Sequence, residues 1–512
     1  MIPRLRGALG IALLCSCAPP VRPAPPEARD FTAFSRLPVE RIIVEKWPMP
    51  APPVPTPREN VVDRYHGVDV SDPYRWLEDA TDPRVSSWMD AQRSVLDRTL
   101  SGSKEREKIR ARLEELLQIG SISLPALRKT REGGTRLFFT RREGAQEQPV
   151  LYVRDGVRGR DVPLVDPNAL ASDGTVALDW YDPSEDGSLL AYGTSQGGSE
   201  DSVLRIRDVK TGKDLPDVLL HTRHASIAWV PDGTRFFYSR YPAPGTVPAG
   251  EERYHRRIYE HRLGRDPKDD PLVFGAELPP TDYPGCQVSP DGRWLIVSIS
   301  RGWDETELRL ADLEQPTLEF RRITPAGKNR YFAIARGDAL YVLTNEGAPR
   351  YRVFRVDPRQ LERERWRLIL DEHPTDVIGN LELVGSELLV SYQSAGISRL
   401  ERFDVEGRSR GAVGLPTLGT SDGFSGLPDG SEAFYNFESF AVPPEIHRLD
   451  LSTGKSELWE AVQAGIPKQD FVVEQHTARS KDGTSVPYRL VRHRSVTPNS
   501  GNNPTLMHGY GG

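Results

Sequence analysis

The sequence predicts a mainly β protein whose central part is a seven-bladed β-propeller preceded by a short helical segment. From about residue 124 to residue 459, short apolar strands such as residues 137–140 and 189–192 alternate with polar turns. Asp-Gly turns recur ahead of apolar strands, and the first three glycines lie 46 and 59 positions apart (233 − 187, 292 − 233), near the roughly 40–50 residues of one propeller blade. At that spacing the stretch holds seven blades, and the repeat favours a propeller over an array of β-sandwiches. The glycines of these turns are Gly187, Gly233, Gly292 and Gly430.

The length and composition exclude several classes of protein. A chain of 512 residues is too long for one ordinary core, so we expect at least two domains. Charged residues make up 27% of the chain, and a net charge of -6 gives no electrostatic basis for binding nucleic acid. No apolar run reaches the roughly 18–20 residues of a transmembrane helix. We expect no cofactor.

The first 58 residues are expected to target and tether the protein rather than to fold. Arg4 and Arg6 precede an apolar stretch, as in a signal peptide. The segment that ends at Cys17 resembles a bacterial lipobox. We therefore expect residues 1–17 to be a signal peptide with lipidation at Cys17. Ordinary signal cleavage is the alternative. Residues 18–58 are dense in proline and predict an extended tether. The expected location is the periplasmic side of a bacterial cell envelope, with membrane contact only through this lipid, or a secreted or periplasmic soluble form.

Residues 59–120 predict a helical segment. Helical spacing runs over residues 83–100 and 105–118. Just before these helices, residues 72–79 read Asp-Pro-Tyr-Arg-Trp-Leu-Glu-Asp. This octapeptide resembles the N-terminal segment of prolyl oligopeptidases, a family of serine peptidases in which a β-propeller caps an α/β-hydrolase domain. The resemblance implies that the segment packs against the hydrolase domain.

The resemblance continues through the expected propeller, residues 121–462. It rests there on short matches that include Leu-Pro-Asp at residues 215–217 and His-Arg-Leu-Gly at residues 261–264. Beyond the propeller, residues 480–484 read Ser-Lys-Asp-Gly-Thr, which resembles the opening of the family's hydrolase domain. Residues 463–512 are therefore expected to begin an incomplete α/β-hydrolase domain and to contain its first three strands.

The final Gly-Tyr-Gly-Gly turn carries Tyr510. It resembles the oxyanion loop of the family, which implies that the Tyr510 phenol donates a hydrogen bond to the negative oxygen of the tetrahedral intermediate. The nucleophile, the acid and the histidine of an α/β-hydrolase follow this loop in sequence, so we expect them to be absent from the chain. Two Gly-x-Ser-x-Gly strings, at residues 193–197 and 419–423, lack the following helix that a nucleophile elbow needs and are interpreted as propeller turns.

Three propeller residues are predicted by the same resemblance to face the substrate cavity. His224 falls where the family places an aromatic lining residue, and Trp303 takes a place often held by cysteine. Glu200 matches an acidic residue at the interdomain face. The alternative for each of them is an ordinary loop residue at a blade end.

Two histidines and one cysteine could suggest further chemistry. His255 and His261 lie close in sequence without a third ligand, so we expect solvent-facing strand residues and no metal site. Cys286 is expected to be an inert buried thiol.

The predicted function is that of a serine endopeptidase of the prolyl oligopeptidase type. It would cleave short proline-containing peptides after proline, with the propeller excluding folded proteins. This chain alone is expected to be an inactive monomer. Two alternatives are a non-enzymatic envelope propeller that binds peptides or proteins, and the related oligopeptidase that prefers basic residues.

Overall fold

The computed structural model describes residues 54–509 except 102, 465–469, 499 and 502. These residues divide into two compact units, one up to Leu117 and one from Gln118 onward. Cys17 and Tyr510 lie outside the described residues. None of the helices in the described part of the chain is long and apolar enough to span a membrane.

The first unit contains a β-hairpin, a 3-10 helix and two α-helices. The two helices agree with the predicted ranges to within one residue at each end. The first α-helix begins at Pro83 because the carboxylate of Asp82 accepts a hydrogen bond from the backbone N–H of Arg84 at 2.8 Å. The bounds are β1 (Val62–Tyr65), β2 (Val68–Ser71), η2 (Arg75–Glu78), α1 (Pro83–Leu100) and α2 (Lys104–Leu117).

The octapeptide at residues 72–79 anchors this unit. Trp76 is buried, and its indole N–H donates to the carbonyl of Pro57 at 2.9 Å. Arg75 donates to the carboxylate of Asp72 at 2.6 Å and also pairs with Asp63 on β1. The arginine therefore ties the 3-10 helix to the hairpin.

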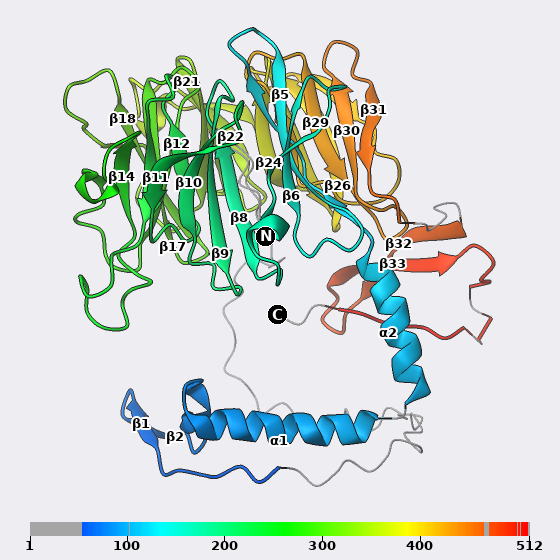
Figure 1. Ribbon diagram of the computed structural model, residues 1–512. Coiled ribbons are helices and arrows are strands. Elements are labelled where there is room, and N and C mark those ends of the chain that lie inside the picture. The colour runs from blue at the N-terminus through cyan, green and yellow to red at the C-terminus, as the bar shows by residue number, and fades with distance from the viewer. Residues whose placement is uncertain (1–53, 102, 465–469, 499, 502, 510–512) are drawn as a thin grey trace. The chain divides into compact units, whose positions relative to one another are not determined.

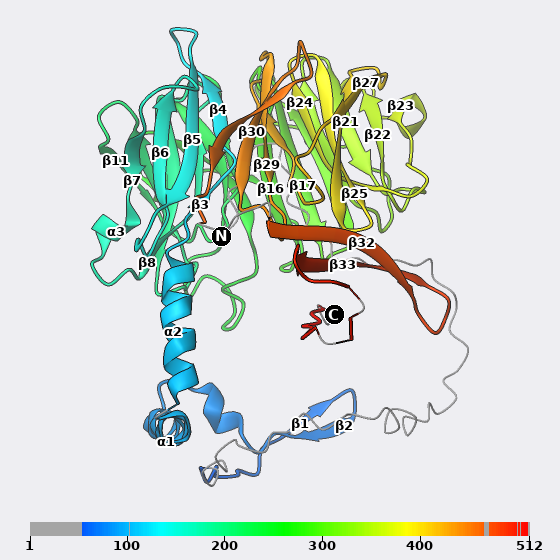
Figure 2. The same ribbon diagram turned by 90° about the vertical axis from the view of Figure 1, so that its right-hand side faces the viewer.

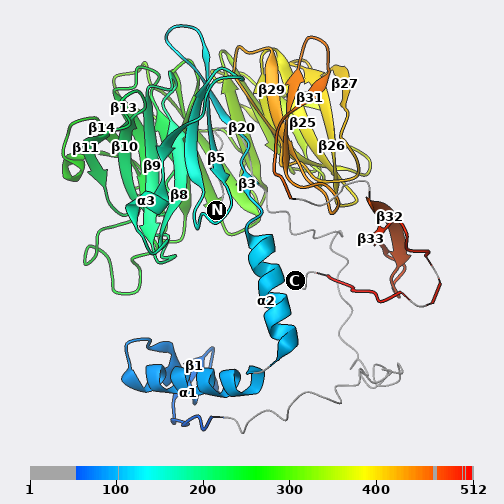
Figure 3. The ribbon, with the colours of Figure 1, turned by 45° about the vertical axis from the view of Figure 1, so that its right-hand side comes forward.

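Within the described residues from Gln118 onward, seven antiparallel sheets form the blades of a β-propeller (Figures 1 and 3). Each blade uses strands that are consecutive in sequence, and the first blade has a fifth short strand because β3 and β4 both pair with β5. The predicted seven-bladed fold is confirmed.

The strands of blades 1 to 3 are β3 (Ser121–Ile122), β4 (Ala126–Lys129), β5 (Thr135–Arg142), β6 (Val150–Asp155) and β7 (Val162–Val165); β8 (Val176–Pro183), β9 (Leu189–Gln196), β10 (Val203–Asp208) and β11 (Asp214–Leu219); and β12 (Ile227–Trp229), β13 (Arg235–Arg240), β14 (Arg257–Arg262) and β15 (Leu272–Phe274). Two short helices lie in the connections, α3 (Pro167–Leu170) and η3 (Pro267–Asp269).

The strands of blades 4 to 7 are β16 (Tyr283–Val288), β17 (Trp294–Arg301), β18 (Glu305–Asp312) and β19 (Arg321–Arg322); β20 (Tyr331–Arg336), β21 (Ala339–Thr344), β22 (Arg352–Val356) and β23 (Arg367–Leu370); β24 (Val377–Val384), β25 (Glu387–Ser394), β26 (Ile397–Asp404) and β27 (Ser409–Val413); and β28 (Phe424–Gly426), β29 (Glu432–Phe437), β30 (Glu445–Asp450) and β31 (Ser456–Ala461). A 3-10 helix, η4 (Arg363–Arg365), precedes β23.

The predicted Asp-Gly turns join the first and second strands of their blades. At Gly187 the backbone is left-handed, with φ of 64°, which glycine adopts without strain. The carboxylate of Asp186 accepts hydrogen bonds from the Ser184 hydroxyl at 2.8 Å and from the Ser188 N–H at 3.0 Å. These bonds stabilise the turn locally, which explains why it could be identified from sequence alone.

The core lies between neighbouring blades. One cluster combines Trp180 and Leu204 of blade 2 with Trp229 and Phe236 of blade 3. Trp229 is fully buried, and its indole N–H donates to the carbonyl of Asp182 in blade 2 at 3.1 Å. Apolar contacts of this kind join each blade to the next around the ring.

Side chains close the ring between blade 1 and blade 7, which lie side by side (cyan and orange in Figure 2). Among the described residues no strand of one blade pairs with a strand of the other. Instead, the Ser425 hydroxyl donates to the carbonyl of Pro125 at 2.7 Å, and the Trp459 indole donates to the carbonyl of Val157 at 2.9 Å. Arg154 lies over the Trp459 ring at 4.8 Å.

After the propeller the chain forms an antiparallel hairpin of β32 (Phe471–Arg479) and β33 (Ser485–His493). The third strand predicted in this region was wrong for the described residues, since 503–509 form no strand. Leu506 and Met507 are 94% and 93% exposed there. In the described part of the chain no neighbouring strand accepts backbone hydrogen bonds from this apolar run.

Candidate functional site

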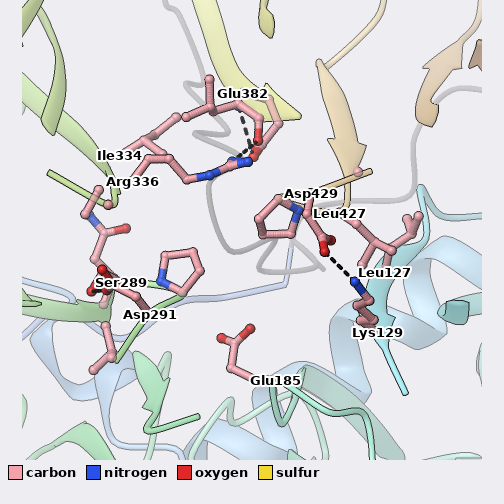
Figure 4. A pocket seen from close by; sticks show the side chains of 18 of the residues that line it. Leu127, Lys129, Glu185, Ser289, Asp291, Ile334, Arg336, Glu382, Leu427 and Asp429 are labelled. Atoms are coloured by element: carbon pink, nitrogen blue, oxygen red, sulfur yellow. Dashed lines mark hydrogen bonds and ion pairs between the residues drawn. The ribbon is translucent and has the colours of Figure 1, made fainter. Parts of the chain in front are cut away.

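A cavity of 490 Å³ opens at the propeller axis, at the end of the blades where the first and second strands are joined. Residues from six blades line it, and several are charged (Figure 4). The charged side chains carry both signs, and apolar side chains such as Leu127, Ile334 and Leu427 line the cavity beside them. The charged lining residues are Arg128, Lys129, Glu185, Asp291, Arg336, Glu382 and Asp429.

One ion pair at the cavity joins the two ends of the ring. Lys129 of β4 in blade 1 pairs with Asp429 in the β28–β29 turn of blade 7. The hydrogen bond from Lys129 lowers the pKa of Asp429 below its usual value. Asp429 therefore stays ionised at neutral pH, and the pair links blades that share no backbone hydrogen bond between described strands.

On another side of the cavity, Arg336 reaches from blade 5 to blade 6. Its guanidinium donates to the carbonyls of Leu383 at 3.4 Å and Gly385 at 2.9 Å. Burial lowers the pKa of Arg336. The Gln287 side-chain amide makes a similar link, donating to the carbonyl of Ala333 at 2.6 Å. Polar side chains at the cavity thus tie successive blades together.

Glu382 carries the most perturbed carboxyl group of the cavity. It lies on β24 beside Arg336, and its side chain accepts a hydrogen bond from the backbone N–H of Leu383 at 3.3 Å. Burial raises the pKa of Glu382 to about 8, against the opposing effects of the Leu383 N–H and of Arg336. At neutral pH the group is mostly a neutral acid.

The structure brings together two of the residues predicted to face a substrate. Glu200 lies in the β9–β10 loop and His224 between β11 and β12, with 3.4 Å from the Glu200 carboxylate to His224 Nε2. Arg223 also pairs with Glu200 and donates to the carbonyl of Ser199 at 2.8 Å. Both Glu200 and His224 have left-handed backbones, with φ of 58° and 47°. Strained non-glycine residues of this kind often mark functional loops.

Trp303 lies in the β17–β18 loop and is 84% exposed. Trp303, Glu200 and His224 all follow second or fourth strands of their blades, so they lie at the opposite strand ends from the axial cavity. Their predicted contact with substrate stays a prediction, as does the role of Tyr510.

Neither Gly-x-Ser-x-Gly string has the geometry of a nucleophile. Ser195 is buried on β9, and its hydroxyl donates to Asp179 at 2.9 Å. Ser421 is buried in a loop, where its N–H donates to the Ser398 hydroxyl at 2.9 Å. A strand follows each string, and in the described chain neither hydroxyl contacts a histidine.

The prediction that His255 and His261 face solvent was wrong for His261. That side chain is fully buried between two carboxylates, Asp217 and Asp270. His255 is partly buried and bonds Glu251 at 2.5 Å. Sequence reasoning missed the arrangement because Asp217 belongs to a different blade from His261, although both lie in motifs that the sequence had singled out.

The structure also bears on candidate metal ligands and on Cys286. Within the described residues, no cluster of His, Cys, Asp or Glu side chains has the arrangement of a metal site. Cys286 is a buried thiol on β16 that takes part in no disulfide among the described residues, in agreement with the expected burial.

The fold defines a seven-bladed β-propeller with an axial cavity lined by charged and apolar side chains, followed by a β-hairpin. A family model for the N-terminal β-propeller domain of prolyl oligopeptidase matches residues 52–462. The chain therefore belongs to the prolyl oligopeptidase family.

Curated relatives agree with this assignment. A prolyl endopeptidase of Elizabethkingia meningoseptica is 30% identical over 482 residues, which cover 94% of this chain and 66% of the relative. A prolyl endopeptidase of Elizabethkingia miricola is 30% identical over 459 residues, covering 89% of this chain and 64% of the relative. The chain thus spans slightly less than two thirds of the length of these relatives.

Solved structures are similar over most of the chain. One from a study of two prolyl endopeptidases superposes with a TM-score of 0.81 at 35% identity, covering 87% of this chain and 65% of that chain. Prolyl oligopeptidase B from Galerina marginata, bound to a 25mer macrocyclization substrate, superposes with a TM-score of 0.78 at 23% identity over 87% of this chain and 66% of that chain. The second likeness concerns the fold alone.

Proposed function

We propose that this chain is the propeller-bearing part of a serine endopeptidase that cleaves short peptides after proline. Its family membership and the names of its relatives support the reaction. The observation that carries the substrate class is the axial cavity. A space of 490 Å³ fits a few residues of an extended peptide but no folded domain, so the propeller would limit substrate size.

Within this proposal, Tyr510 is the side-chain donor to the oxyanion. A phenol O–H directed at the developing negative charge stabilises the transition state more than the ground state. The support is the Gly-Tyr-Gly-Gly sequence at residues 509–512. Substitution of one such donor typically costs roughly 100- to 1000-fold in kcat.

We also propose that the 512-residue chain alone does not turn over peptides. The serines of both Gly-x-Ser-x-Gly strings are buried in the propeller without a histidine base among their described contacts. The reaction needs a nucleophile and base in contact. An active enzyme in which Tyr510 stabilises the oxyanion would therefore need a nucleophile and a base other than Ser195 and Ser421 and their neighbours.

The test uses two proteins: the 512-residue chain and the product of the natural reading frame, including any residues encoded beyond position 512. With a chromogenic peptide that has proline before the scissile bond, we expect turnover and labelling by a serine-reactive phosphonate only for a longer product. In that product Tyr510→Phe should lower kcat by roughly 100- to 1000-fold with little change in KM. Ser195→Ala and Ser421→Ala should leave kcat unchanged. Turnover and labelling of the 512-residue chain would contradict the proposal.

The basic residues Arg4 and Arg6, the apolar stretch after them and Cys17 support a location in the bacterial envelope. We propose lipidation at Cys17, which lies outside the described residues. Metabolic labelling with a palmitate analogue should mark the native chain and not a Cys17→Ser variant. Equal labelling of both would contradict it.

A further inference from the structure

Two sequence motifs that lie far apart in the chain meet inside the propeller. The Leu-Pro-Asp motif places Asp217 on β11, the outermost strand of blade 2. The His-Arg-Leu-Gly motif places His261 near the end of β14 in blade 3. Asp270 follows η3 in the same blade. Together Asp217, His261 and Asp270 form a buried cluster, here named the Asp–His–Asp clamp, at the junction of the two blades.

Both ring nitrogens of His261 contact a carboxylate. Nδ1 lies 2.9 and 3.0 Å from the two Asp270 oxygens, and Nε2 lies 3.0 Å from Asp217 Oδ1. The three side chains are 0%, 3% and 1% exposed for His261, Asp270 and Asp217. Ionised carboxylates only accept hydrogen bonds, so with both aspartates ionised the two contacts are favourable only if each nitrogen carries a proton. The geometry therefore favours a positively charged imidazolium between two carboxylates.

Other donors hold the two carboxylates in place. The backbone N–H of Gly264 donates to Asp217 at 2.6 Å, and the Tyr238 hydroxyl donates to Asp270 at 2.8 Å. The neighbouring strand β13 carries two arginines: Arg240 donates to the Tyr238 oxygen at 3.0 Å, and Arg235 pairs with Glu260 at 3.0 Å. These contacts fix both carboxylates toward the ring of His261.

The pKa of His261 reflects its burial and its two carboxylate neighbours. Burial lowers the pKa of an imidazolium, but the hydrogen bonds to Asp270 and Asp217 outweigh it, so the pKa of His261 is raised above its usual value. The rings of Phe236 and Tyr238 lie 5.3 and 6.5 Å from the imidazole and exclude water.

We propose that the Asp–His–Asp clamp is a proton-dependent lock between blades 2 and 3, closed while His261 is doubly protonated and weakened when it loses one proton. A neutral ring has one nitrogen lone pair. The unprotonated nitrogen then faces a buried carboxylate oxygen with no proton between them, and the lone pairs of the two atoms repel each other. The lock does not depend on the proposed peptidase activity, because it concerns the propeller alone.

The sign of the pH dependence is fixed. In the unfolded chain His261 deprotonates near its usual pKa of about 6.5. The folded protein keeps the proton to higher pH, so between these values the unfolded state binds fewer protons and stability falls as pH rises. The stabilisation by the clamp is complete below about pH 6.5 and is lost as pH passes the folded pKa of His261.

The test measures urea unfolding midpoints of the 512-residue chain from about pH 6 to about pH 9.5, a range that brackets the ordinary histidine pKa. The native midpoint should fall across this range, and His261→Gln and Asp217→Asn should each flatten that dependence. Asp217→Asn keeps the side-chain volume and gives a neutral partner that can donate to an unprotonated Nε2. His476→Gln, at a partly exposed site on β32, is the matched control and should keep the native slope.

A second readout needs no variant. The pH dependence of hydrogen–deuterium exchange at the C2 position of each histidine, followed by mass spectrometry, reports its pKa in the native chain. We expect His261 to titrate above about pH 6.5 and its ring to exchange roughly tenfold more slowly than that of His476. A His261 pKa at or below about 6.5, or an unchanged slope in either folded variant, would overturn the proposal.

Discussion

Replacing Glu382 by glutamine should make the protein more stable at high pH. Glutamine keeps the size and the hydrogen-bond acceptor for the Leu383 N–H but cannot ionise. In the native protein burial raises the pKa of Glu382 from 4.5 to about 8, so the unfolded chain loses this proton first. The native free energy of unfolding therefore falls as pH rises from about 4.5 toward 8, and the variant lacks this loss.

The magnitude follows from the same values. At roughly 1.4 kcal/mol per pH unit, the interval from 4.5 to about 8 gives a ceiling of ~5 kcal/mol. Glu382 lines a cavity and is not fully enclosed, so solvent reduces this figure. We expect the variant to match the native protein near pH 4.5 and to exceed its stability by about 2 kcal/mol near pH 8.

The assay is urea unfolding followed by tryptophan fluorescence, repeated at intervals from about pH 4.5 to about pH 8.5, which spans the two pKa values of Glu382. Glu277→Gln, the same exchange at an exposed position, is the control and should follow the native curve. A stability difference between Glu382→Gln and the native protein that does not grow with pH would refute the reasoning. So would a variant that loses stability relative to the native protein at the alkaline end of the range.

Two further substitutions test the packing of the ring. Gly193→Ala should destabilise the protein by about 3 kcal/mol, because the added Cβ would lie 2.3 Å from the buried Trp180 ring on the neighbouring strand; Gly414→Ala, where nothing lies within 4 Å, should be close to neutral in the same thermal melt. Trp459→Ala should cost about 3 kcal/mol and speed amide exchange in blades 1 and 7 before the others, because its indole bonds Val157 across the ring closure. Native exchange rates in those two blades would contradict this.

Local patterns determined most of the fold. The octapeptide at residues 72–79, the helical spacing of α1 and the Asp-Gly turns each depend on residues close in sequence, and the helix and the turns formed where predicted. The turn at Asp186 illustrates the reason, because its hydrogen bonds come from Ser184 and Ser188, each two positions away in the chain. The family resemblance drew on the same kind of short stretch, and it was confirmed.

Only the tertiary structure decided the chemistry of the buried polar groups. His261 looked like a strand residue facing solvent, because nothing near it in sequence shows that Asp217 of another blade lies 3.0 Å away. The pKa of Glu382 likewise depends on blades that meet at one axis. Burial and charge are sums over neighbours in space, and in a propeller those neighbours come from different blades, whereas strand and turn formation depends on the adjacent few residues.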